Sequence, residues 1–244
     1  MITLFKKEVS IFLSTLIGCL IIGGFLLVNS ILLWSDLSKL NILDHGYADM
    51  DIFFEISPLL FLLFIPAISM RVFTEEYTNG TIETLITKPI TSLQIVLSKF
   101  LSIFSLILFT ILPTLTYVIS IYYLGENVGN LDLAGILGSY FGLILLCALF
   151  SSIGVYASSI ANNQIVSFIL ATLLNTLFYF GFDILSGFYF FQSIDLIIQQ
   201  IGVSFHYEMM SKGLLRLSDV IYFLSFTFLF IKLTTSVIIK KKKA

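Results

Sequence analysis

The sequence predicts an all-α polytopic membrane protein, built as a single domain over residues 1–244 with six transmembrane helices. Composition is the first reason, because 58% of the residues are hydrophobic, only 11% are charged and the mean hydropathy is +1.03. In a soluble domain, charged residues make up roughly a quarter of the chain. The second reason is that uncharged runs reach the about 20 residues that a helix needs to cross a bilayer. These runs are continuous rather than alternating, which favours helices over a barrel.

Short polar segments divide the chain into the six predicted spans. We expect the spans at residues 11–34, 52–73, 93–124, 133–159, 164–183 and 217–239. The first apolar stretch is far longer than the roughly 7–15 residues of a secretory signal, and no cleavage site of small residues follows it. We therefore expect it to remain in the protein as a membrane anchor.

The first dozen residues have the pattern of an amphipathic helix. Apolar side chains gather near one helical face and charged side chains fall largely on the other, with Leu4, Phe5, Val9 and Phe12 opposite Lys6, Lys7 and Glu8. This pattern predicts an N-terminal interfacial helix that lies along the membrane surface. The alternative is that the two lysines are a basic flank that only sets the topology.

The distribution of lysine and arginine predicts the orientation of the chain. If both termini are cytoplasmic, nine basic residues lie inside: Lys6, Lys7, Arg71, Lys88, Lys99 and Lys240–Lys243. Only Lys39, Lys212 and Arg216 then lie outside. The excess of positive charge on cytoplasmic segments therefore predicts cytoplasmic termini. We expect Lys99, near the start of the third span, to extend its ammonium group to the inner surface.

Prolines mark local features of the second and third spans. Ser57-Pro58 fits a helix cap followed by a first helical residue, which would begin the second helix there. Glu55 would then lie at the membrane interface, and the alternative is a carboxylate that takes part in transport. Pro113 predicts a bend in the third span.

The later spans carry three weaker signals. Gly138 and Gly142 have the spacing that allows two helices to approach closely. Residues 184–216 contain an apolar aromatic stretch too short to cross the bilayer, which predicts an outer re-entrant hairpin between the fifth and sixth spans. We expect Lys232, inside the last span, to extend toward the inner surface; pairing with an acidic group is the alternative.

The polar segment between the second and third spans has the signals of a folded structure. Asn79 and Gly80 accept the left-handed backbone that ends helices, and Gly80 fits the N-cap of a short helix with Glu83 at its third position. An apolar stripe at helical spacing follows, formed by Ile82, Leu85 and Ile86. Pro89 ends this helix, and Thr91-Ser92-Leu93-Gln94 is a capping box that opens the third span.

The sequence has no motif of a catalytic or nucleotide-binding site. GxxxxGK[ST], HExxH, CxxC and GxSxG do not occur. Cys19 and Cys147 are each isolated in a span, and we expect His45 and His206 to be structural or solvated residues of outer loops. A net charge of −2 gives no reason to expect binding of nucleic acid. The spans contain few of the ionisable groups that an ion-driven carrier usually needs. We expect neither enzyme activity nor a cofactor in this chain, so a partner would supply the energy.

The segment Arg71–Ile90, Arg-Val-Phe-Thr-Glu-Glu-Tyr-Thr-Asn-Gly-Thr-Ile-Glu-Thr-Leu-Ile-Thr-Lys-Pro-Ile, resembles the region between the second and third spans of ABC-2 type transporter permeases. The resemblance extends over essentially the whole chain, from the Leu4–Glu8 start to the predicted outer hairpin. Further stretches, including Asn41–Asp49 and Phe61–Arg71, resemble the gliding-motility-associated permease of Bacteroidetes. Lys88 departs from related permeases, which often carry arginine there, but its positive charge is retained.

The resemblance implies a coupling helix at Gly80–Lys88 that rests in a groove of an ATPase subunit. The ATPase-coupling residues would be Arg71, Glu75, Glu76, Gly80, Thr81, Ile82, Glu83, Leu85, Ile86 and Lys88. The uncharged turn between the fourth and fifth spans is a candidate for a second inner contact, through Asn162, Asn163 and Gln164. The alternative for the apolar stripe is that it lies against this protein's own inner surface.

The resemblance also implies partners and a location. They are a separate ABC ATPase subunit that binds ATP and Mg, a second permease (a copy or a paralogue), membrane lipid and an optional accessory subunit. The chain would lie in the bacterial inner membrane and act in a process associated with gliding motility. The rival interpretation is a structural or regulatory membrane subunit of a motility or secretion apparatus that transports nothing.

Overall fold

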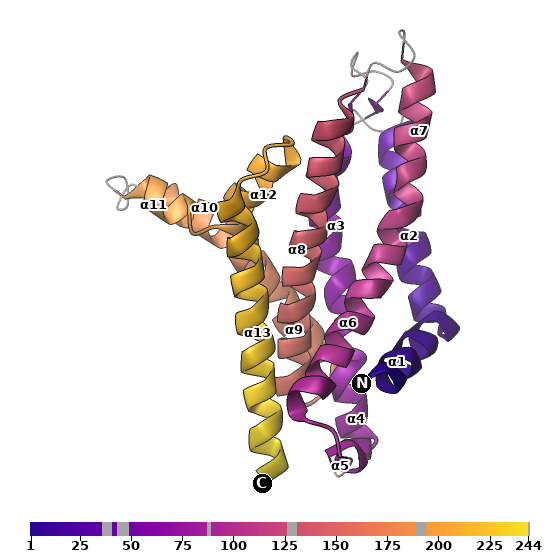
Figure 1. Ribbon diagram of the computed structural model, residues 1–244, viewed down its shortest axis with the longest axis vertical. Helices are drawn as coiled ribbons and strands as arrows, with labels where there is room; N and C mark the ends of the chain where they lie inside the picture. The colour runs from indigo at the N-terminus through magenta and orange to yellow at the C-terminus, as the bar shows by residue number, and fades with distance from the viewer. Residues whose placement is uncertain (36–40, 43–48, 87–88, 126–130, 189–193, 244) are drawn as a thin grey trace.

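The computed structural model describes residues 1–35, 41–42, 49–86, 89–125, 131–188 and 194–243. Helices make up 87% of the structure, and the described residues contain no strand, so the predicted all-α class is confirmed (Figure 1). The helices are α1 (Ile2–Ser14), α2 (Leu16–Trp34), α3 (Asp51–Ser69), α4 (Arg71–Thr78), α5 (Thr81–Ile86), α6 (Ser92–Ile111), the 3₁₀ turn η2 (Leu112–Thr114), α7 (Leu115–Leu124), α8 (Leu133–Ile160), α9 (Gln164–Thr176), the π turn η3 (Leu177–Gly181), α10 (Phe182–Ser186), α11 (Asp195–Gln199), α12 (Val203–Ser211) and α13 (Leu217–Lys243).

Five of the described helices are long and apolar enough to cross a membrane. They comprise Asp51–Thr78, Ser92–Leu124, Leu133–Ile160, Gln164–Ser186 and Leu217–Lys242. A sixth span is obtained if α1 and α2, which are bent by 64°, are taken together. The later five match the predicted spans with ends that differ by a few residues. We call the end of the bundle where α1, α5 and the C-terminus lie the terminal end, and the other the opposite end (Figure 1).

The first predicted span begins too early, because the helix breaks at Thr15 instead of continuing from residue 11. Thr15 has extended backbone angles (φ −90°, ψ 145°), and its hydroxyl donates to the Phe12 carbonyl over 2.9 Å. Such local side-chain bonds offer the backbone an alternative to the helix. The helix α1 packs against α6, and its buried face carries Leu4, Glu8 and Phe12. Glu8 therefore lies on the inward face, contrary to its predicted place on the charged one.

The second span begins at Asp51, so the predicted cap at Ser57-Pro58 is wrong. Both Pro58 and Pro66 lie inside α3. The helix starts earlier because the Asp51 amide donates to the Asp49 side chain over 3.4 Å and Asp51 places a carboxylate in the first turn, where it opposes the positive helix end. At the terminal end the span continues through α4 to Thr78, five residues beyond its predicted end.

The helix α8 is the centre of the bundle and packs against α3, α6, α9, α12 and α13. Its glycines allow close approach. A Cβ atom at Gly142 would lie 2.7 Å from the Met210 Cβ, and one at Gly138 would lie 3.3 Å from the Gly213 Cα. The close contact predicted from this pair is confirmed, and its partner is α12 with the turn that follows.

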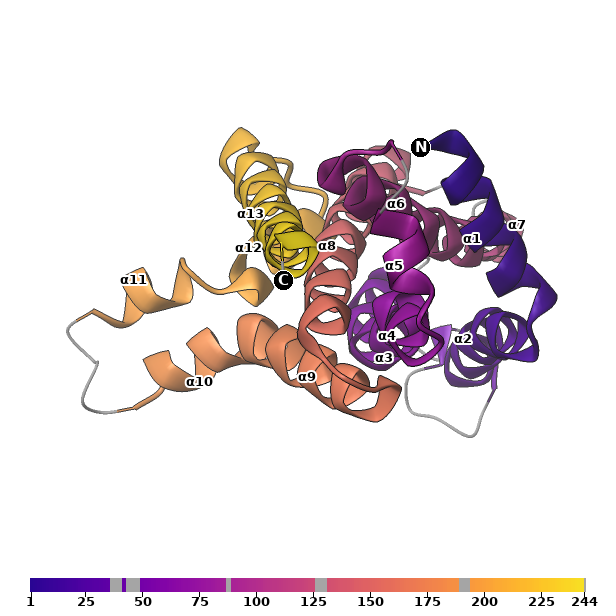
Figure 2. The same ribbon diagram turned by 90° about the horizontal axis from the view of Figure 1, so that it is seen from below.

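Local breaks shape two other spans. The 3₁₀ turn η2 interrupts the third span at Pro113, as predicted, and the π turn η3 interrupts the fifth. Beyond η3, α10 and α11 pack side by side and extend sideways from the bundle (Figure 2). The segment predicted to form a re-entrant hairpin thus carries α10, α11 and α12, and the re-entrant hairpin itself stays a prediction.

Lys232 is exposed on α13, with its ammonium 5.1 Å from the centre of the Phe228 ring. Phe228 lies one turn nearer the opposite end. The Lys232 side chain therefore does not extend toward the terminal end, contrary to prediction.

Gly154→Ala should lower the stability of the fold, because a Cβ atom there would lie 2.7 Å from the Ser69 Cβ on α3, an atom that side-chain rotation cannot move away. Relieving this overlap requires α3 and α8 to separate, which costs about 1–3 kcal/mol. The measurement is the apparent Tm in nanodiscs.

The matched control is Gly23→Ala on α2, where the added Cβ would meet nothing within 4 Å. This variant should be as stable as the wild type or more so, since alanine favours helix. Equal Tm values for the two variants would contradict the close approach of α3 and α8.

Candidate functional site

The helices α4 and α5 form a helix–turn–helix at the terminal end, which we call the α4–α5 unit (Figures 1 and 2). The turn between the two helices lies at Asn79 and Gly80, as predicted. The Asn79 amide donates to the Glu75 carbonyl over 3.0 Å, the Gly80 amide donates to the Tyr77 carbonyl over 3.3 Å, and Gly80 has φ +67°. A residue with a Cβ atom rarely adopts this conformation. Gly80 thus reverses the chain direction between the two helices.

The described part of the short helix, Thr81–Ile86, lies within the predicted range Gly80–Lys88. Thr87 and Lys88 lie outside the described residues, as do the side chains of Leu85 and Ile86. The next helix begins with the predicted capping box, in which Thr91 and Gln94 exchange side-chain and backbone hydrogen bonds of 3.2 and 3.3 Å.

The described side chains of α5 divide between an exposed and an inward face. Thr81 and Glu83 are exposed, whereas Ile82 is half-buried and packs against the protein's own apolar core. For Ile82, the structure therefore favours the alternative that the stripe lies against this chain. Among the described side chains of α5, the exposed ones are polar and include the Glu83 carboxylate.

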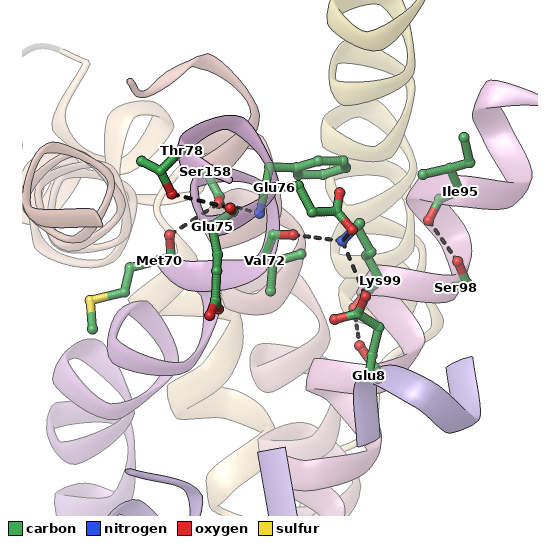
Figure 3. A network of polar contacts seen from close by, with 12 residues as sticks. Glu8, Met70, Val72, Glu75, Glu76, Thr78, Ile95, Ser98, Lys99 and Ser158 are labelled. Carbon is green, nitrogen blue, oxygen red and sulfur yellow. Dashed lines mark hydrogen bonds and ion pairs between the residues drawn. The ribbon is translucent and has the colours of Figure 1, made fainter. Parts of the chain in front are cut away.

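A buried lysine connects the α4–α5 unit to its neighbours (Figure 3). The Lys99 Nζ on α6 lies 2.8 Å from the Glu76 Oε1 on α4 and 3.3 Å from the Glu8 Oε1 on α1. It also donates to the Val72 carbonyl over 2.6 Å and lies 4.9 Å from the centre of the Phe73 ring. Three helices thus meet at one ammonium group.

Lys99 is 0% exposed, so the prediction that it extends to the inner surface is wrong. The physical reason is that two carboxylates and a carbonyl oxygen replace the water that an ammonium group needs. Glu76 is only 9% exposed. Its carboxylate is bonded within the chain, although the resemblance implies Glu76 as one of the ATPase-coupling residues.

Glu75 has the opposite orientation. Its Oε1 lies 3.1 Å from the Arg71 Nη2, one turn back on α4, and its side chain is 40% exposed. Such a surface pair contributes little stability, typically below about 1 kcal/mol. Of the two adjacent glutamates, Glu75 is therefore the one that presents a carboxylate at the surface.

The other side of α4 is fastened to the end of α8. The Phe73 amide donates to the Ser158 Oγ over 3.0 Å, and the Tyr77 hydroxyl donates to the Ser159 carbonyl over 3.0 Å. Lys241, near the end of α13, donates to the same Ser159 carbonyl over 3.1 Å, and its Nζ lies 3.6 Å from the centre of the Tyr77 ring. The α4–α5 unit, the turn after α8 and the end of α13 therefore form one connected surface.

The residues predicted as a second inner contact lie at this turn. Asn162 and Asn163 are exposed, and Gln164 is half-buried. The Asn163 Oδ1 accepts a hydrogen bond of 2.8 Å from the Val166 amide, so this side chain caps α9. The capping of α9 therefore explains why Asn163 lies in this turn.

Sequence reasoning missed several residues of this surface, among them Glu8, Tyr77, Ser158 and Lys241. Their contacts join positions 82 to 91 residues apart, beyond the range of any local motif. Glu8 carried one signal, a carboxylate within the sequence of an amphipathic helix, which predicted the wrong face.

The opposite end carries a pocket of about 550 Å³ between α3, η3 and α12. Glu55, Tyr179, Tyr207 and Glu208 are among the residues that line it. The Tyr207 hydroxyl donates to the Phe54 carbonyl on α3 over 2.6 Å. Lys212, at the rim, donates to Glu208 over 2.7 Å, and this bond raises the pKa of the lysine. Within the described residues, no three His, Cys, Asp or Glu side chains are arranged to hold a metal ion.

Lys99→Met should destabilise the protein by about 3–5 kcal/mol, because it leaves Glu8 and Glu76 as buried carboxylates without their cation. The measurement is thermal unfolding in nanodiscs.

The triple variant Lys99→Met/Glu8→Gln/Glu76→Gln removes all three charges and should recover most of the loss. If Lys99→Met alone unfolds like the wild type, the buried network does not exist as described.

The comparison with protein families agrees with this architecture, whereas no curated protein matches the sequence. The model of a family described as ABC-2 family transporter protein matches residues 9–243. Since the match covers nearly the whole chain, the protein belongs to the ABC-2 family of transporter proteins and is a multi-pass transmembrane component of an ABC transporter.

Proposed function

We propose that this chain is the permease subunit through which a separate ATPase drives transport across the bacterial inner membrane. Family membership supports a transmembrane component that works with an ABC ATPase subunit. In the proposed orientation the terminal end is cytoplasmic. That end carries most of the lysines, in accord with the positive-inside rule.

The α4–α5 unit is the proposed contact with the ATPase. Its surface offers Glu75, Thr81 and Glu83, and its turn is fixed by Gly80. Basic groups on the ATPase would meet the two carboxylates, whereas Glu76 would act from within by holding α4. Asn162 and Gln164, on the surface connected to α4 through Ser158 and Ser159, form the proposed second contact.

The observation that carries the proposal is the network around Lys99. A displacement of α4 has to move α1 and α6 with it, because the same ammonium group binds Glu8 and Glu76. On its other side, α4 is bonded to α8 through Phe73 and Tyr77. A push on the α4–α5 unit is thereby distributed over three of the membrane spans and α1.

The proposal assigns no covalent chemistry to this chain. ATP and Mg would bind to the partner ATPase, and a second permease, either a copy or a paralogue, would complete the membrane part. The resemblance of Asn41–Asp49 and Phe61–Arg71 to a gliding-motility permease supports a role in that process. Cargo-dependent stimulation of the ATPase in proteoliposomes distinguishes a transporter from a structural subunit that moves nothing.

Glu83→Lys should weaken the docking of the ATPase, because it reverses the charge of the exposed carboxylate on α5. The measurement is the ATP hydrolysis that co-purifies with the tagged protein from native membranes. The expected result is a loss of most of this activity without a change in the Tm of the permease.

The matched control is Glu208→Lys, the same change at an exposed residue of the opposite end. This variant should retain the co-purified activity. Equal activity with both variants would refute Glu83 as a contact, and no ATPase activity with the wild type would favour the structural subunit.

A further inference from the structure

His206 lies on α12, not in a loop as predicted, and connects three segments of the opposite end. Its Nδ1 lies 2.7 Å from the Asp219 Oδ1 in the first turn of α13. Its Nε2 lies 2.8 Å from the backbone carbonyl of Gln200, directly after α11. Both ring nitrogens therefore face acceptor oxygens.

This geometry fixes the number of protons that the pair must hold. A backbone carbonyl only accepts, so the Nε2 has to carry a hydrogen. At the other nitrogen, one further proton is needed between the Nδ1 and the carboxylate, on either the imidazole or Asp219. If that proton leaves, one of the two contacts becomes a repulsion between two lone pairs. With the proton on the ring, the pair is an imidazolium and a carboxylate, and Asp219 also opposes the positive end of α13.

Tyr222 makes two further contacts between the same segments. The His206 ring stacks on the Tyr222 ring of α13, with 4.0 Å between centroids. The Tyr222 hydroxyl in turn donates to the Ile201 carbonyl over 2.5 Å. The pair thus joins α12 and the end of α11 to α13.

We propose that the His206–Asp219 pair is a proton-dependent latch that fastens α11 and α12 to α13 in acid and releases them as the pH rises. The proton is bound below the titration of the imidazole and lost above it, so the closed form belongs to the lower pH. Histidine ordinarily exchanges its proton near pH 6.5, a range that external media cross.

Loss of the His206–Asp219 contact would affect the pocket at the opposite end. Tyr207, the next residue of α12, lines that pocket and bonds to the Phe54 carbonyl of α3. Loss of the contact with α13 would leave this wall held by α8 and α3, through the close approach of Met210 to Gly142 and the Tyr207–Phe54 hydrogen bond. In the proposed orientation the latch lies on the side away from the cytoplasm, and it would set how readily the pocket opens there.

The other charged groups around α12 are Asp51 and Glu55 on α3, Asp183 on α10, Asp195 on α11, the Glu208–Lys212 pair, and Arg216 before α13. The variants below distinguish the response of His206 from theirs.

The test is a distance measurement between spin labels on α11 and α13. The labels are placed at the exposed positions Leu196→Cys and Leu217→Cys, after replacement of Cys19 and Cys147, in nanodiscs without ATPase or ATP. At about pH 5.5 we expect a narrow distance distribution, and at about pH 8.5 the loss of the narrow peak, since these values lie on either side of the ordinary histidine titration.

Two variants decide the assignment. His206→Phe keeps a ring against Tyr222 but donates no hydrogen bond, so its distribution should be broad at both pH values. Asp219→Asn places an amide opposite the Nδ1, and this amide can donate to the neutral ring as well as accept from the protonated ring, so its distribution should stay narrow at both pH values. A wild-type distribution that does not change with pH, or a change that persists in His206→Phe, would overturn the latch. Because no partner is present, this result is independent of the proposed ATPase docking.

Discussion

The burial of one ammonium group constrains the whole terminal end of this protein. Lys99 is inaccessible to water, so its charge has to be balanced by groups that the fold itself supplies. Glu8, Glu76 and the Val72 carbonyl meet this requirement, and they come from two helices other than its own. The positions of α1, α4 and α6 are therefore not independent. Any arrangement that separates these helices exposes the ammonium group or leaves a carboxylate buried without its cation.

This constraint helps to hold the α4–α5 unit folded and in place, which its short helices could not do by themselves. Helices of six and eight residues are too short to be stable by themselves. Here one is continuous with a membrane span, and both are joined by a fixed glycine turn. Polar bonds from the end of α8 hold the other side through Ser158 and Ser159. The unit is therefore held from both sides, as the proposed transmission of displacement to several spans requires.

The two ends of the bundle use different electrostatics. At the terminal end, a buried lysine between two glutamates connects three helices. At the opposite end, the corresponding connection between elements is made by a histidine and an aspartate. The first is the connection that the proposed coupling requires. The second is the pair that we propose as a proton-dependent latch.

The sequence by itself determined what depends on neighbours within a few residues: the helical class, five of the spans, the Gly80 turn, the bend at Pro113 and the Thr91–Gln94 capping box. Only the tertiary structure decided the burial of Lys99 and the inward orientation of Glu8. Lipid and protein interior are both apolar, so hydrophobicity cannot say which face of a helix meets protein. α8 is mostly buried and the similarly apolar span Gln164–Ser186 is mostly exposed. Contacts such as Glu8–Lys99 join residues 91 apart, and packing alone selects them.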